Sequence, residues 1–298
     1  MSVASTPSDA VIASALVAHG LVGDVEDAHV RGYELPRIRA IHRALRKHAA
    51  APRPSVLDVG YLHGFVPFTL RALDSELEIT ATERDEAAVR EARLRAAELL
   101  PGLRVETLDL TRFPDFERTY HAVILGEVLE HISVEHLPHI LGSLRGILAP
   151  AGIIVITTPN LHGLIPRLRH ALGADFLHDP VAHAAMGMPH INLLSARMLA
   201  DVARSEGLDL AAVEFYDFTS RMRARSSRRA RATAALRSAT LSCWAPATRD
   251  DLLMVLRRSE SETTPSPVFA RPNVSLREAV RAARELSPRT YRRACRAA

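Results

Sequence analysis

Short apolar runs that alternate with helix-like segments constrain the fold of this chain more than any other feature of its sequence. Seven runs occupy residues 55–60, 78–83, 103–110, 120–127, 152–160, 208–218 and 250–258. The clearest segments with helical spacing between them are residues 85–100, capped by Asp85, and 195–208, capped by Ser195. Strands that alternate with helices predict an α/β fold with a parallel sheet and right-handed crossovers.

Composition divides the 298 residues into three parts. Residues 1–54 have helical spacing and end in a proline-containing break, which predicts a helical N-terminal cap. Residues 55–258 are the predicted core, interrupted by an irregular segment at about 161–192 and an Arg- and Ala-rich segment at 219–248. Residues 259–298 begin with SESETTPSP and are predicted to be a linker and a helical tail.

Several protein classes are excluded by composition. Hydrophobic residues make up 47% and charged residues 24%, which is ordinary for a globular protein and excludes a mostly disordered chain. Two cysteines, Cys243 and Cys295, are too few for a disulfide scaffold and favour a cytoplasmic location. No apolar run is long enough to span a membrane. Asp9 interrupts the first apolar stretch, so we do not expect a signal peptide.

Charge is distributed unevenly along the chain. Residues 219–298 hold 18 Lys and Arg against 6 Asp and Glu, whereas residues 1–218 hold 20 against 28. The segment RMRARSSRRARATAALR (221–237) either binds an anionic partner or pairs with the acidic core, within one chain or across a homodimer. It contains no aromatic residue, so we expect no nucleic-acid partner.

Glycines and acidic residues follow the first three apolar runs. The first run ends in DVGYLHG (58–64), in which Gly60 and Gly64 allow the backbone to turn closely past a ligand. Glu83, 23 residues after Gly60, ends the second run and can accept both hydroxyl hydrogens of a ribose. Asp109 lies at the end of the third run, and its carboxylate can accept a hydrogen bond from an adenine amino group. The alternatives are a tight turn for the glycines and a turn cap for Asp109, but three such ends in a row favour a nucleoside site.

Longer stretches of the sequence are similar to one enzyme family. VLDVGYLHG (56–64), TATERD (80–85), ETLDL (106–110), HAVILGEVLEHI (121–132) and LAPAGIIVITTPN (148–160) follow one another in the order found there. In these segments the chain resembles class I S-adenosylmethionine-dependent methyltransferases, and its EVLEH and TPN elements look most like the small-molecule and sugar types. The resemblance implies a Rossmann-like sheet of seven strands, the last antiparallel to the others.

The resemblance also implies which residues bind S-adenosylmethionine. Asp58 would meet the methionine amino group, Glu83 the ribose hydroxyls and Asp109 the adenine edge. All the implied contacts lie at strand ends: Asp58, Gly60, Tyr61, Gly64, Glu83, Arg84, Asp109, Leu110, Gly126 and Glu127. In related enzymes, residues placed like Tyr33, Arg37 and Arg39 of the N-terminal cap often close over the carboxylate end of the cofactor; the alternative is that they are solvated charges on a helix.

Leu62 departs from the family pattern, because the family usually has a glycine at its position. This departure leaves open a second interpretation, a methyltransferase fold that does not transfer methyl and serves as another enzyme or as a binding module. The basic C-terminal region leaves open a third, a methyltransferase that acts on RNA or on a carrier.

Two histidines are candidate catalytic bases. His131 lies four residues after Glu127, so the two would share a face if that segment were helical, and Glu127 or Glu135 could orient the imidazole. His190 precedes the helix predicted at 195–208, where substrate loops often lie in this family. The alternatives are a packing residue for His131 and an exposed loop residue for His190.

Five histidines between residues 162 and 190 raise the question of a metal site. Their spacing is irregular and contains neither HxH nor HExxH, so we expect no metal and interpret 161–192 as a substrate lid. The predicted function is methyl transfer from S-adenosylmethionine to an oxygen or nitrogen of a small molecule, such as a specialised metabolite or a sugar. The Arg- and Ala-rich composition suits a bacterial biosynthetic enzyme.

Overall fold

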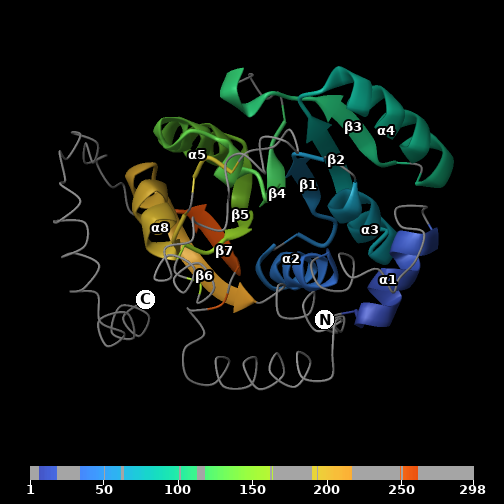
Figure 1. Ribbon diagram of the computed structural model, residues 1–298, viewed down its shortest axis with the longest axis horizontal. Helices are drawn as coiled ribbons and strands as arrows, with labels where there is room; N and C mark the ends of the chain where they lie inside the picture. Colours follow the sequence, from blue (N-terminus) through green and yellow to red (C-terminus); the bar gives the residue numbers. More distant parts are fainter. Residues whose placement is uncertain are drawn as a thin grey trace, which may run out of the picture. The chain divides into compact units, whose positions relative to one another are not determined.

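The computed structural model contains six described helices and seven strands (Figure 1). It describes residues 7–18, 34–49, 51–61, 64–100, 102–112, 118–161, 163, 190–192, 194–216, 249 and 251–260. The helices are α1 (Asp9–Ala18), α2 (Leu35–His48), α3 (Phe65–Leu73), α4 (Glu86–Leu99), α5 (Leu137–Gly146) and α8 (Ala196–Ser205). The strands are β1 (Ser55–Val59), β2 (Glu78–Glu83), β3 (Arg104–Thr107), β4 (Tyr120–Gly126), β5 (Leu148–Pro159), β6 (Leu208–Tyr216) and β7 (Asp251–Arg258).

All seven strands form one sheet in the order β3-β2-β1-β4-β5-β7-β6. Strands β1 to β5 pair in parallel, whereas β7 runs antiparallel to both of its neighbours, β5 and β6. The Rossmann-like sheet with an antiparallel last strand is therefore confirmed. Its carboxyl edge, where β1 to β6 end and β7 begins, includes the reversal of strand order between β1 and β4, the place where such sheets bind ligands.

Two apolar layers cover the sheet because successive strand residues point to opposite faces. Val56, Ile124 and Val155 face one layer, in which α1 to α4 bury residues such as Phe68 and Ile41. The next residues along the same strands, Leu57, Leu125 and Ile156, face the other layer with α5 and α8. The central strands β4 and β5 are thus buried on both faces, as their apolar runs predicted, whereas the edge strands β3 and β6 are partly exposed.

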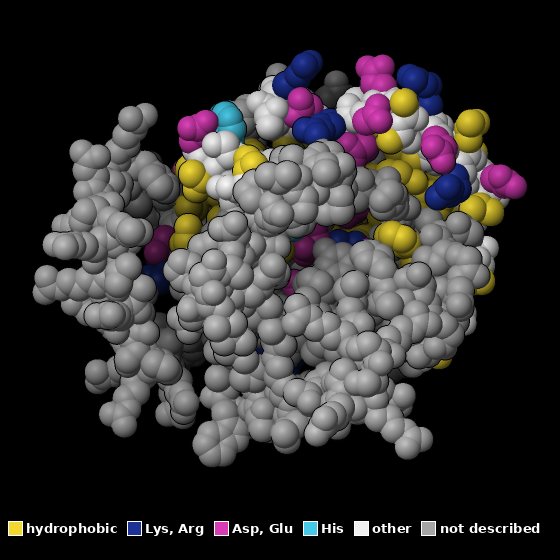
Figure 2. Space-filling model, in the orientation of Figure 1, with side chains coloured by type: hydrophobic (Ala, Val, Ile, Leu, Met, Phe, Trp, Pro, Cys, Tyr) yellow, Lys and Arg dark blue, Asp and Glu magenta, His cyan; other side chains and the backbone are white. Residues whose placement is uncertain are grey.

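Local sequence signals set several helix ends. Asp85 accepts a hydrogen bond from the backbone of Ala87 at 2.9 Å and caps α4, and Ser195 accepts one from Met198 at 3.2 Å and caps α8. Around α4 the surface carries acidic and basic side chains intermixed (Figure 2), among them the i,i+4 pairs of Arg90 with Glu86 and Arg95 with Glu91. Among the described helices, none is long and apolar enough to cross a membrane.

Two elements differ from the sequence prediction. The third strand ends at Thr107, three residues early, because the chain turns into a 3-10 turn, η2 (Leu110–Arg112), two residues later. The helix predicted at 133–148 begins only at Leu137, after the 3-10 turn η4 (Val134–His136), and β5 already begins at Leu148. The Arg- and Ala-rich segment 219–248 and the tail from residue 261 onward lie outside the described residues, as does most of the predicted lid.

Candidate functional site

A pocket of about 620 Å³ lies at the carboxyl ends of β2 and β3. Its lining is mostly charged and polar and consists of Arg84, Asp85, Glu86, Thr107, Leu108, Asp109 and Arg112. The volume is in the range of small-molecule sites, and the lining includes two of the residues predicted for the nucleoside, Arg84 and Asp109. Sequence analysis missed Leu108, although its place directly after β3 marks it as a strand-end residue.

Two carboxylates beside the pocket are held by local hydrogen bonds. Oε1 of Glu83 accepts from the backbone amides of Arg84 at 2.7 Å and Asp85 at 3.4 Å. Oδ1 of Asp109 accepts from the hydroxyl and the backbone amide of Thr111. The Thr111 hydroxyl bond is the main reason that the pKa of Asp109 is lowered, so Asp109 caps η2 as well as lining the pocket.

Leu110 and Tyr61 lie in the apolar layers rather than in the pocket. Leu110 is buried on the α5 side of the sheet. Tyr61 is buried on the other side, with its ring 6.0 Å from that of Phe68, and its backbone amide donates to Thr82 across the end of β1. Neither side chain lines the pocket.

The loop after β1, here called the glycine corner (residues 60–64), has a backbone conformation that only glycine adopts easily at Gly60 and Gly64. Gly60 and Gly64 have φ of +80° and +77°, a conformation that other residues rarely adopt. A Cβ on Gly60 would lie 2.8 Å from Val128, and one on Gly64 would lie 2.8 Å from Tyr61. Packing within the protein therefore explains both glycines, and the tight backbone turn places this loop at the strand-order reversal. Leu62 lies outside the described residues.

Asp58 is a buried acid at the end of β1. Burial raises its pKa to about 7, although the nearby Arg37 guanidinium acts in the opposite direction. Arg37 comes from α2, is itself buried, and forms a 2.7 Å ion pair with Glu34. The Arg37 guanidinium is thus close enough to Asp58 to affect its pKa while it is paired with Glu34.

The segment after β4 is not the α-helix that we considered for Glu127 and His131. Glu127 has φ of +57°, which ends the strand sharply, and the 3-10 turn η3 (Leu129–His131) follows instead of an α-helix. The two side chains therefore do not share a helix face. Glu135 pairs with His136 at 4.0 Å, so the structure gives it no role in orienting His131. Gly126, the last residue of β4, pairs with Thr157 of β5.

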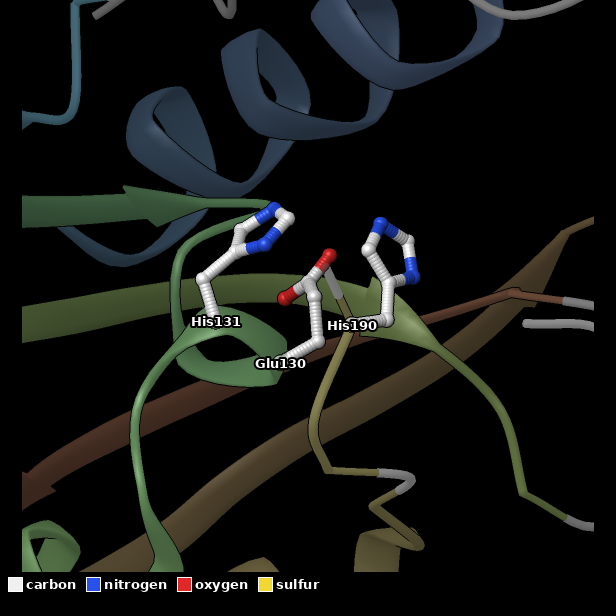
Figure 3. Close-up of side chains that lie close together, drawn as sticks. All are labelled: Glu130, His131 and His190. Atoms are coloured by element: carbon white, nitrogen blue, oxygen red, sulfur yellow. The ribbon is translucent and has the colours of Figure 1, made fainter. Parts of the chain in front are cut away.

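The two candidate bases lie together, next to an acid that sequence analysis missed. The rings of His131 and His190 are 4.7 Å apart, edge to face. The carboxylate of Glu130 lies between them (Figure 3). Glu130 is fully buried; burial raises its pKa well above the ordinary range, and the neighbouring Glu127 carboxylate raises it further. The EVLEH motif contained this signal, because its second acid directly precedes the histidine.

Two further ionisable residues reach the carboxyl edge from the last strands. Tyr216 ends β6 and pairs with Asp251, which begins β7 and also pairs with Pro159 of β5. Burial raises the pKa of Tyr216 well above its ordinary value, and the carboxylates of Glu127 and Asp251 add to the effect. Sequence analysis missed both residues, because only the antiparallel direction of β7 brings its first residue to this edge.

Solved structures share this fold at low sequence identity. The CcbJ methyltransferase from Streptomyces caelestis has a TM-score of 0.51 and 20% identity over 75% of this chain and 89% of that chain. Magnesium protoporphyrin IX methyltransferase (ChlM) from Synechocystis PCC 6803, with bound SAH, has a TM-score of 0.53 and 15% identity. The match covers 80% of this chain and 89% of that chain. The [4+2]-cyclase SpnF has a TM-score of 0.50 and 17% identity, and the match covers 74% of this chain and 81% of that chain.

Sequence comparison identifies the family. No curated protein matches the chain. A family model described as a methyltransferase domain matches residues 28–213, which include α2, strands β1 to β5, most of β6 and every predicted cofactor contact. The chain therefore belongs to the methyltransferase domain family.

Proposed function

We propose that this protein transfers a methyl group from S-adenosylmethionine to an oxygen or nitrogen of a small molecule. The observation that carries the proposal is the pocket at the ends of β2 and β3, whose lining begins at Arg84, directly after Glu83, in a methyltransferase domain. The comparisons add support, because ChlM was solved with SAH, the demethylated form of this cofactor, and CcbJ is also a methyltransferase.

The residues present fit this cofactor. The pocket has room for an adenosyl group, with Leu108 available to the adenine face and the Glu83 carboxylate beside the ribose position. Asp58 and Arg37 offer a carboxylate and a guanidinium to the amino and carboxylate groups of the methionine end. The cofactor supplies an electrophilic methyl: the acceptor lone pair forms the new bond to carbon, and the carbon–sulfur electron pair stays on sulfur.

The protein's own part is positioning and proton transfer. Aligning acceptor, methyl and sulfur gives much of the acceleration of a displacement reaction. His131 and His190 lie at the strand-order reversal, beyond the methionine end, and either imidazole could take a proton from the acceptor. The lid predicted at 161–192, which His190 ends, would cover the acceptor.

Titration calorimetry with S-adenosylmethionine and with SAH tests the proposal. We expect micromolar binding, weakened about tenfold or more in Glu83→Gln, because a charge-assisted hydrogen bond contributes roughly 1.5–3 kcal/mol. Glu78→Gln is the matched control, since Glu78 is exposed at the other end of the same strand. If protein shown by mass spectrometry to carry no ligand binds neither compound, the cofactor site is absent.

One alternative has an observation in its favour. The [4+2]-cyclase SpnF shares the fold, and Leu62 replaces the usual glycine of the cofactor loop, so a member of this fold need not transfer methyl. Binding of S-adenosylmethionine without turnover of any hydroxyl or amine acceptor in a broad panel would favour this alternative. Restoration of turnover by Leu62→Gly would identify the loop as the cause.

A further inference from the structure

Three side chains with metal-ligating atoms meet beyond the end of β4. One carboxylate oxygen of Glu130 and one imidazole nitrogen each of His131 and His190 all lie within 4.8 Å of one another. In Figure 3 the three side chains extend to the same side, with the carboxylate between the two rings. Within the described part of the chain, no second group of three or more His, Cys, Asp or Glu meets this condition.

Backbone contacts hold the group together although His190 is 59 residues from His131. The carbonyl oxygen of Glu130 accepts hydrogen bonds from the amides of Ile191 at 2.8 Å and Asn192 at 3.1 Å. The side-chain amide of Asn192 donates to the carbonyl of Ile132, which ties the same two segments again. Small side-chain rotations then suffice to bring the ligand atoms to the ~3.4 Å separation that metal bonds of about 2.1 Å imply.

The local charge also suits a cation. Oε1 of Glu130 and Oε1 of Glu127 are both buried, and no described amide, hydroxyl or basic group donates a hydrogen bond to either. Oε2 of Glu130 accepts from the hydroxyl of Thr158 at 3.1 Å, the kind of outer contact that orients a ligating carboxylate. Glu130 therefore brings a buried carboxylate oxygen without a hydrogen-bond donor to the two imidazoles, and the Glu127 carboxylate beside it adds negative charge.

We propose that Glu130, His131 and His190 bind one divalent transition-metal ion that holds the acceptor oxygen. One carboxylate and two imidazoles suit ions such as Zn²⁺ or Fe²⁺ and leave coordination positions open. This proposal replaces the expectation of no metal, which rested on spacing within 162–190 and did not consider Glu130. It also replaces the role of His131 or His190 as the base, because an imidazole that ligates the ion cannot accept the proton.

The ion narrows the acceptor class, and this step rests on the proposed function. A Lewis acid lowers the pKa of a hydroxyl group, whereas it would occupy the lone pair that an amine needs for attack. The acceptor is therefore an alcohol or phenol. Its proton passes to solvent, its oxygen bonds to the methyl carbon, and the carbon–sulfur electron pair stays on sulfur.

Metal binding is tested without the cofactor. The full chain, stripped with a chelator, is titrated with Co²⁺ by visible absorption and with Zn²⁺ by calorimetry. We expect one ion per chain and a loss of affinity of about tenfold or more in Glu130→Gln and in His190→Gln. The control is Glu135→Gln with His136→Gln, a second Glu-His pair in the same segment, which is largely exposed and should leave affinity unchanged.

The outcomes separate the two proposals. No binding of either ion, or equal affinity in the cluster and control variants, overturns the metal site. S-adenosylmethionine is titrated into the stripped protein in parallel, so cofactor binding without metal binding refutes this inference alone. Because Glu130 is buried, the thermal unfolding of its variant is recorded too, and His190→Gln decides the result if Glu130→Gln does not fold.

Discussion

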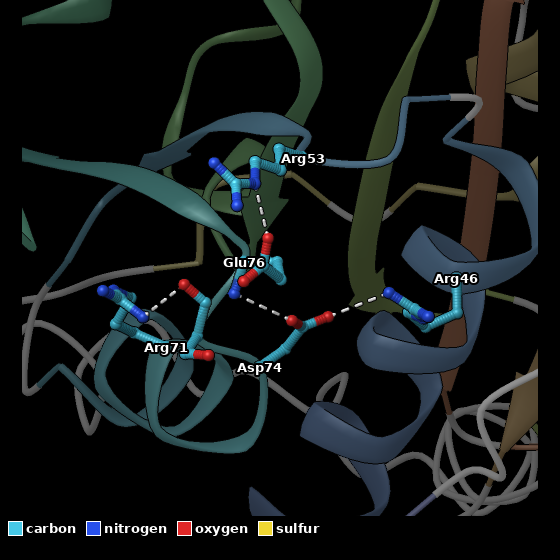
Figure 4. Close-up of polar contacts among 6 residues, drawn as sticks. Arg46, Arg53, Arg71, Asp74 and Glu76 are labelled. Atoms are coloured by element: carbon cyan, nitrogen blue, oxygen red, sulfur yellow. Dashed lines mark hydrogen bonds and ion pairs between the residues drawn. The ribbon is translucent and has the colours of Figure 1, made fainter.

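The two edges of the sheet use charged residues in opposite ways. At the amino edge, opposite charges pair close to solvent: Arg46 contacts Asp74 at 3.0 Å and Arg53 contacts Glu76 at 2.6 Å (Figure 4). Asp74 also accepts from the backbone amide of Glu76 at 3.1 Å, so the loop before β2 is fixed to α2 and to the start of β1.

At the carboxyl ends of β1 and β4, away from the exposed charges of the pocket at β2 and β3, the acids Asp58 and Glu130 are buried. Burial raises the pKa of Asp58, Glu130 and Tyr216, and the neighbouring carboxylates strengthen the effect for the last two. Such groups lower the stability of the folded state at neutral pH, and perturbed pKa values cluster at functional sites. The comparison teaches that the amino edge pairs its charges in a way that stabilises the fold, whereas the carboxyl edge keeps buried acids whose pKa values are raised, as the proposed site requires.

The largest expected difference between the edges is in pH dependence. Burial raises the pKa of Asp58 from 3.8 to about 7, so between these values the unfolded chain releases a proton that the folded chain keeps. The free energy of unfolding of the wild type should therefore fall as pH rises through this range, by at most about 4 kcal/mol from this group. Asp58→Asn removes that contribution, which urea unfolding at pH 4.5 and pH 8 would measure.

The control for this experiment lies at the amino edge. Asp74→Asn disrupts a partly exposed ion pair and should lower the free energy of unfolding at pH 8 by only about 1 kcal/mol or less. The interpretation of the carboxyl edge is wrong if Asp58→Asn keeps the pH slope of the wild type.

Glycines at the two edges should also respond differently. Gly64→Ala places a Cβ 2.8 Å from the Tyr61 ring at a φ of +77°, and strain plus overpacking should cost about 3 kcal/mol. Gly146, in the last turn of α5 before β5 begins, has nothing within 4 Å of an added Cβ. Gly146→Ala should stabilise by about 0.5 kcal/mol, because alanine favours the helix.

Chemical denaturation of both variants checks this pair. The wild type and the two variants are compared under one condition, and S-adenosylmethionine binding is measured where Gly64→Ala remains folded. Equal stability of the two variants would show that the glycine corner is not under the constraint that its geometry indicates.

Most of the fold could be predicted from sequence because its signals are local. The second strand, Glu78–Glu83, and the α4 cap at Asp85 agree with the prediction, since apolar runs and capping residues act on their own segment. The third strand was predicted too long because Leu108 and Leu110 continue its apolar pattern. The hydrogen bonds of Asp109 to Thr111 turn the chain there instead, and a strand pattern does not reveal them.

The site was harder to predict because it depends on which strands become neighbours. His131 and His190 were chosen separately, and only the folded chain places them 4.7 Å apart. A helix shared by Glu127 and His131 was considered as one possibility, but the positive φ of Glu127 is a tertiary feature that residue spacing cannot show. Tyr216 and Asp251 come from consecutive strands of the sequence, yet they share the site because β7 reverses direction.

Removing a hydroxyl group at each edge should give a smaller difference in the free energy of unfolding. Thr158→Val removes the donor to the buried Oε2 of Glu130 and should lower the free energy of unfolding by about 1–3 kcal/mol. Ser55→Ala removes a contact of 2.9 Å with Nδ1 of His121 at the start of β1, which is only partly buried, so about 0.5–1 kcal/mol is expected. Thermal unfolding of both variants compares them, and a greater loss in Ser55→Ala would contradict the contrast between the edges.

The smallest expected effect is the coupling between Arg46 and Asp74. A double-mutant cycle of Arg46→Ala and Asp74→Ala should give roughly 0.2–1 kcal/mol, because water and salt screen a pair at this depth. Raising the salt concentration to 1 M should reduce the coupling further. Arg53 and Glu76 are more exposed and should couple less still, so they serve as the reference pair. A coupling above about 2 kcal/mol would mean that the amino edge also holds strongly interacting charges, and the functional distinction between the edges would then rest on the sign of the buried charge alone.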